Sequence, residues 1–141
     1  MSPPAGNHPE VRIVNPGGPL GLIMVIDDED PVTLLAELVL SREGYSVVTA
    51  RDGYQAVDIF RKLHERVSLV VLDYIMPGMD GAAVFKELRK IKPGLPVVFT
   101  SGFISPAKLD AILGEAGCSF FPKPLAPSKL LQNVRLALGS A

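Results

Sequence analysis

The sequence predicts an α/β fold in which a parallel sheet is covered by helices on both faces. Five short apolar runs, rich in Val, Ile, Leu and Phe, alternate with five segments of helical periodicity, and the runs cover residues 22–26, 47–50, 69–72, 96–100 and 118–121. Nearly continuous apolar runs of this length are typical of strands buried on both faces. Strands that alternate with helices form parallel sheets with right-handed crossovers.

Each helix has a recognisable start or stop signal. The first is predicted over 31–43, with Asp30 as N-cap, Pro31 at the first helical position and Gly44 at the stop. The second covers about 54–66 and the third about 82–91, both with an apolar stripe at helical spacing. The fourth begins at Ser105 and Pro106 and ends near Gly117, and the fifth follows Pro127.

The N-terminal segment has a different composition. Residues 1–21 contain five Pro and four Gly, residues that disfavour regular elements. We therefore predict a flexible tail or linker over 1–21 and one domain over 22–138, with a short strand at 11–14 as the weaker alternative.

Composition and charge exclude several classes of protein. The net charge is −1, Trp is absent, and Cys118 is the only cysteine. These values argue against direct nucleic-acid binding and against a disulfide framework. No apolar stretch approaches the ~18 residues needed to cross a bilayer, and the N-terminus lacks a secretory signal. We therefore expect no membrane insertion and a cytoplasmic location.

Polar residues follow four of the five strands. Asp27 and Asp28 come after the first strand, Asp73 ends the third, Thr100 ends the fourth, and Lys123 follows the fifth. The carboxyl ends of parallel strands lie at one edge of the sheet, where ligands bind. Crowded carboxylates repel one another unless a cation lies among them, and Mg²⁺ prefers oxygen ligands. The pattern predicts a Mg²⁺ site at which a carboxylate accepts a phosphoryl group, with Thr100 and Lys123 binding phosphoryl oxygens.

Four motifs carry a family resemblance: IMVIDDED, LVVLDYIMPGMDG, VVFTSG and FFPKPL. In these motifs 45 residues separate Asp28 from Asp73, 27 separate Asp73 from Thr100, and 23 separate Thr100 from Lys123. With this order and spacing, residues 22–138 resemble the receiver domain of two-component response regulators, including the chemotaxis regulators.

The resemblance implies a flavodoxin-like (βα)5 fold with strand order 2-1-3-4-5. It implies that Asp73 accepts a phosphoryl group from a histidine kinase or a histidine phosphotransfer protein. Asp27, Asp28, Asp73 and the backbone carbonyl of Ile75 would hold Mg²⁺. The protein would then be a phosphoprotein of signal transduction or of a phosphorelay, and not an enzyme beyond its own phosphorylation and dephosphorylation.

The resemblance also implies a switch in which Thr100 moves toward the phosphoryl group and the aromatic side chain of Phe120 turns inward. Phe120 stands where the family often has Tyr. The downstream partner, or a second copy in a homodimer, would bind the face formed by the fourth helix, the fifth strand and the fifth helix, and the candidate residues there are Lys108, Asp110, Lys129, Gln132 and Arg135. Ile75 stands where many relatives have a polar residue, and an apolar side chain cannot orient an attacking water. We therefore expect slow loss of phosphate.

Two alternative functions and the context of the chain stay open at this stage. A haloacid-dehalogenase-like phosphatase would use Asp28 as nucleophile and Asp30 as acid, with Thr100 or Ser101 and Lys123 in later roles. A degenerate receiver would bind partners without phosphorylation. The chain is either a stand-alone regulator or a receiver fragment of a larger protein such as a hybrid histidine kinase.

Overall fold

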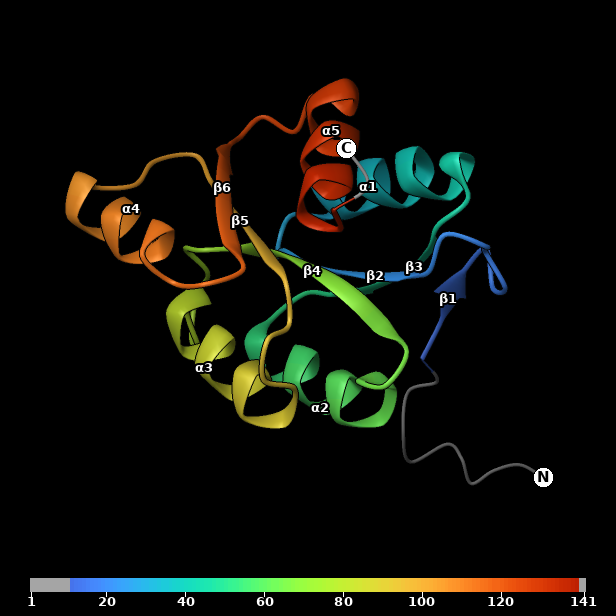
Figure 1. The fold of residues 1–141 in the computed structure, drawn as a ribbon, viewed down its shortest axis with the longest axis horizontal. Helices are drawn as coiled ribbons and strands as arrows, with labels where there is room; N and C mark the ends of the chain where they lie inside the picture. Colours follow the sequence, from blue (N-terminus) through green and yellow to red (C-terminus); the bar gives the residue numbers. More distant parts are fainter. Residues whose placement is uncertain (1–10, 140–141) are drawn as a thin grey trace.

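The computed structural model describes residues 11–139, which form a six-stranded sheet between two layers of helices (Figure 1). The strands are β1 (Ile13–Val14), β2 (Leu22–Ile26), β3 (Ser46–Ala50), β4 (Val67–Asp73), β5 (Val97–Ser101) and β6 (Cys118–Pro122). The helices are α1 (Asp30–Glu43), α2 (Gly53–Leu63), α3 (Gly81–Ile91), α4 (Pro106–Leu113) and α5 (Pro127–Ala137). The sheet order is β1-β3-β2-β4-β5-β6, and β2 to β6 are parallel. The predicted order of the five parallel strands is confirmed.

The sixth strand, β1, corrects the prediction for the N-terminal segment. Ile13 and Val14 pair antiparallel with β3. Two side chains hold the turn that follows: the Asn15 amide donates to the Tyr45 carbonyl at 3.0 Å, and the Ser46 hydroxyl donates to the Asn15 carbonyl at 2.7 Å. Hydrogen bonding to the free edge of β3 therefore overrides the Pro- and Gly-rich composition. The prediction of an irregular tail is wrong for Ile13 and Val14, and its first ten residues lie outside the described range.

The start of α1 differs from the prediction. Glu29, not Asp30, is the N-cap residue, and its side chain makes no capping hydrogen bond. Asp30 lies inside the helix, and its carboxylate pairs with Arg51 at 3.2 Å. The predicted stop is confirmed, because Gly44 adopts the left-handed conformation with φ 110°.

Other helix boundaries follow local caps. Asp52 accepts a hydrogen bond from the Gln55 amide at 2.8 Å to begin α2, and Asp80 accepts one from the Ala83 amide at 3.0 Å to begin α3. Ser105 caps α4 as predicted, but α4 ends at Leu113, before the predicted stop near Gly117.

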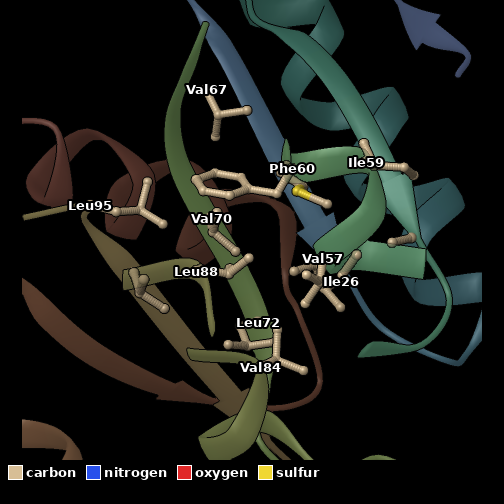
Figure 2. Close-up of a cluster of buried hydrophobic side chains, with 14 of the residues drawn as sticks. Ile26, Val57, Ile59, Phe60, Val67, Val70, Leu72, Val84, Leu88 and Leu95 are labelled. Atoms are coloured by element: carbon tan, nitrogen blue, oxygen red, sulfur yellow. The ribbon is translucent and has the colours of Figure 1, made fainter. Parts of the chain in front are cut away.

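The core has two layers, one on each face of the sheet. The side chains of α1 and α5 pack on one face, and those of α2, α3 and α4 pack on the other. In Figure 2 the fully buried ring of Phe60 lies against β4 beside Val67 and Val70. Because β2 and β5 are buried along their whole length and β4 nearly so, the core fixes the carboxyl ends of these strands. No helix within residues 11–139 has the length and apolar character required to cross a membrane.

Candidate functional site

The predicted polar residues meet at the carboxyl edge of the sheet. Asp27 directly follows β2, and Asp73 ends β4. The β4–β5 register places Asp73 beside Thr100. Lys123 directly follows β6, and its backbone amide donates to the Ser101 carbonyl at 3.0 Å. Residues far apart in the sequence therefore reach one edge because their strands are neighbours.

The Lys123 ammonium lies at the centre of the site. Its Nζ atom is 2.9 Å from Asp27 Oδ2 and 3.1 Å from Asp73 Oδ2. Both carboxylates are almost fully buried, at 2% and 4% exposure. A buried charge needs a partner, and here one cation serves two anions. The acidic site is thus short of positive charge among the described residues.

The ionisation of these groups reflects that shortage. Burial raises the pKa of Asp27 above its ordinary value, although the hydrogen bond from Lys123 opposes the shift. Burial also raises the pKa of Asp73, and the negative charge of Asp27 adds to the increase. For Lys123, burial acts to lower the pKa, but hydrogen bonds to both carboxylates dominate and raise it. The ammonium is therefore held in its charged form.

Three carboxylates are positioned to share a cation. One oxygen each from Asp27, Asp28 and Asp73 lies within 4.8 Å of the others. Asp28 and Asp73 also line an open hollow of about 610 Å³ together with Ile75 and Lys123. Hard oxygen donors in this number beside an open space fit Mg²⁺, which keeps several waters. The Ile75 amide donates to Asp73 Oδ1 at 3.2 Å, so the Ile75 backbone also adjoins this cluster.

The two predicted switch residues lie in different surroundings. Thr100 is buried at 1% exposure, and its carbonyl accepts a hydrogen bond from the Tyr74 amide at 2.8 Å. Phe120 pairs with Phe99 across β5 and β6 and is partly buried against the core. The structure thus brings Thr100 to the site and places Phe120 one strand further along the sheet.

The five candidate residues of the predicted partner face differ in their contacts. Lys108, Asp110, Lys129 and Gln132 are exposed on α4 and α5. Arg135 is also exposed, but its guanidinium lies 2.6 Å from Glu43 at the end of α1. This ion pair holds Arg135 on the α1 side of α5.

The site contains one residue that the sequence did not single out. Glu29 Oε1 lies 3.3 Å from Lys123 Nζ, so a third carboxylate reaches the same ammonium. Its place directly after Asp27 and Asp28 could have indicated a site residue, but the direction of its side chain cannot be predicted from the sequence. Asp30, the acid required by the phosphatase alternative, instead pairs with Arg51.

Comparison with known proteins identifies the class. The family model for the response regulator receiver domain matches residues 23–135. The solved receiver domain of the hybrid histidine kinase CckA is 34% identical, with a TM-score of 0.73 over 84% of this chain and 99% of that one. The chemotaxis protein CheY4 of Vibrio cholerae is 26% identical, with a TM-score of 0.76 over 84% of this chain and 98% of that one. The chain belongs to the response regulator receiver domain family.

Curated relatives are much longer proteins. The sensor kinase CckA of Brucella abortus (strain 2308) is 34% identical over 80% of this chain, which corresponds to 12% of the kinase. The transcriptional regulatory protein GlrR of Escherichia coli (strain K12) is 34% identical over 82% of this chain and 26% of that protein. The chain therefore spans a small part of these relatives. Receiver domains are signalling domains of two-component systems and bind Mg²⁺ at an acidic pocket, and the described part of this chain contains a cluster of three aspartates.

Proposed function

We propose that this chain accepts a phosphoryl group on Asp73, with Mg²⁺, from a phosphohistidine of a histidine kinase or a histidine phosphotransfer protein. The single observation that carries the proposal is the contact of the buried Asp73 carboxylate with Lys123, beside Asp27 and Asp28. A complex of CheX and CheY with BeF3 and Mg²⁺ from Borrelia burgdorferi, 25% identical with a TM-score of 0.74, supports the choice of metal.

Each residue of the site has a separate role in phosphoryl transfer. An Asp73 oxygen attacks phosphorus, the bond from phosphorus to the donor nitrogen breaks, and the imidazole leaves with a proton from solvent. Lys123 binds a phosphoryl oxygen through its ammonium, and Thr100 binds another through its hydroxyl. Asp27, Asp28, Asp73 and the Ile75 carbonyl would hold Mg²⁺, which would neutralise charge on the transferred group. Catalysis by the chain is therefore positioning and electrostatics.

Phosphorylation replaces the single negative charge of the Asp73 carboxylate with a phosphoryl group that carries about −1.5 to −2, so the centre of this site gains up to about one negative charge. We propose that Thr100 moves toward the added group, that Phe120 turns inward, and that the surface of α4, β6 and α5 then binds a downstream protein or a second copy of the chain. The half-burial of Phe120 supports this role, because the side chain has space outside the core from which to turn.

The biological setting is part of the proposal. The similarity to the CckA receiver favours a receiver within a hybrid kinase or phosphorelay, and a stand-alone regulator is the other setting. We place the receiver unit at residues 22–138 and the protein in the cytoplasm, which the single cysteine supports.

The direct test is phosphorylation of the chain by acetyl phosphate and Mg²⁺, measured by intact mass. Wild type is expected to gain one phosphoryl group, and Asp73→Asn is expected to gain none because the attacking oxygen is replaced by an amide. Absence of the gain in wild type, together with absence of Mg²⁺ binding, would refute the proposal and favour a receiver that binds partners without phosphorylation. A gain that persists in Asp73→Asn would move the acceptor to another carboxylate, with Asp28 tested first.

The lifetime of the phosphoryl group is a separate prediction. The Ile75 side chain is 52% exposed and lines the hollow beside Asp73, where it has no group to orient an attacking water. Ile75→Asn is expected to accelerate loss of phosphate several-fold, less than the ~100-fold at which general acid–base contributions begin, because an amide orients a water molecule but does not take its proton. Loss is followed by intact mass after removal of the donor. A wild-type half-life of only seconds, or no change in the variant, would contradict this role.

A further inference from the structure

Glu29 makes an ion pair that its place in the helix does not require. It is the N-cap residue of α1, where a short Ser, Thr, Asp or Asn side chain usually accepts a backbone hydrogen bond. The Glu29 side chain makes no such bond. Its Oε1 atom instead lies 3.3 Å from Lys123 Nζ, on a residue 94 positions away in the sequence. The side chain therefore acts at the site and not at the helix end.

The Glu29 carboxylate adds a further negative charge to a site that already has more carboxylates than ammonium groups. Lys123 already contacts Asp27 at 2.9 Å and Asp73 at 3.1 Å. Glu29 also lines the hollow beside Asp73 through which a donor would approach. An incoming phosphoryl group thus meets the Glu29 carboxylate at the rim of the hollow. The Lys123 ammonium, which would bind that group, already contacts three carboxylates.

We propose that Glu29 is a positioning residue that holds the Lys123 ammonium toward α1 and slows phosphorylation of Asp73 by small anionic phosphodonors. The inference rests on the proposed function and deepens it. With its negative charge, Glu29 would make the rim of the site selective against small anionic phosphodonors that are free in solution. The Glu29 side chain is 58% exposed, so solvent and salt screen its charge. Its effect is therefore a modest change in rate and not an on–off switch.

The test compares Glu29→Gln with Asp30→Asn. Asp30 is the matched control because its carboxylate is 60% exposed and pairs with Arg51. Initial rates of phosphorylation by acetyl phosphate are measured at saturating Mg²⁺ over a series of KCl concentrations. Glu29→Gln is expected to be faster by about two- to five-fold at low salt, the range of exposed ion pairs, with a smaller gain at high salt. Asp30→Asn is expected to match wild type.

A second readout requires neither metal nor donor. Carbon-13 relaxation of the Lys123 side chain in EDTA is expected to show greater motion in Glu29→Gln than in wild type or in Asp30→Asn. Equal rates in all three proteins, or equal acceleration in both variants, would overturn the inference while leaving the proposed function intact. Absence of phosphorylation in wild type would overturn both the proposed function and the inference.

Discussion

Lys123→Met is expected to destabilise the metal-free protein by about 3 kcal/mol at neutral pH, the lower end for removing one partner of a buried ion pair. The ammonium is the cation shared by the buried carboxylates of Asp27 and Asp73, at 2.9 and 3.1 Å. Methionine fills similar volume but leaves both negative charges uncompensated. Urea unfolding in EDTA measures the effect. The matched control is Lys129→Met, an exposed lysine on α5 that is expected to stay near wild type.

The loss in Lys123→Met is expected to shrink as the pH falls toward about 4, near the ordinary carboxyl pKa. Burial already raises the pKa of Asp27 and of Asp73 in the folded state. Above the ordinary value, the folded state therefore binds more protons than the unfolded chain, and the free energy of unfolding falls as the pH rises. Removing the ammonium raises both pKa values further and steepens this fall. Added Mg²⁺ is expected to restore stability at neutral pH, because a ligand that binds only the folded state stabilises it. A loss independent of both pH and Mg²⁺ would indicate a packing effect and contradict the electrostatic account.

Gly81→Ala is expected to reduce stability by about 2 kcal/mol, as for overpacking of a close contact, and to weaken Mg²⁺ binding. A Cβ atom at Gly81 would lie 2.6 Å from Tyr74 Cα and 2.7 Å from the Asp73 carbonyl oxygen. These are backbone atoms, so the segment after β4 has to shift. That segment directly follows Asp73, the proposed phosphoacceptor, and includes Ile75. Urea unfolding and Mg²⁺ titration followed by NMR measure the two effects.

The control for Gly81→Ala is Gly102→Ala in the loop after β5. A Cβ atom there meets nothing within 4 Å, so stability and Mg²⁺ affinity are expected to remain near wild type. An equal loss in both variants would show that the backbone flexibility of these two glycines matters, and would contradict the steric explanation. Unchanged Mg²⁺ affinity in a destabilised Gly81→Ala would separate the fold from the metal site.

The parallel sheet could be predicted because apolar runs and helix caps are local signals. Strand ends then located Asp27, Asp73, Thr100 and Lys123, since parallel strands bring their carboxyl ends to one edge. Three features could not be predicted in this way. The start of α1 has no side-chain cap to mark it, because the Glu29 side chain makes no capping hydrogen bond. The pairing of β1 depends on a sheet edge completed by residues more than thirty positions away.

The third feature, the side-chain direction of Glu29, depends on where Lys123 arrives after β6. The pairing of β1 and the direction of the Glu29 side chain are therefore decided by contacts with residues distant in sequence, which the local sequence does not specify. Arg135 shows the same limit, because its orientation depends on Glu43 of another helix and not on its own sequence neighbours.

The short strand β1 also affects how the molecule avoids unwanted association. A free sheet edge offers a row of backbone donors and acceptors to any neighbouring chain. Here β1 covers the β3 edge with only two paired residues and is followed by Pro16, and the opposite edge strand, β6, ends in Pro122. Short strands and prolines make poor templates for further pairing. Both edges of the sheet therefore disfavour permanent growth of the sheet, and the helical surfaces are the faces left for contact with another protein.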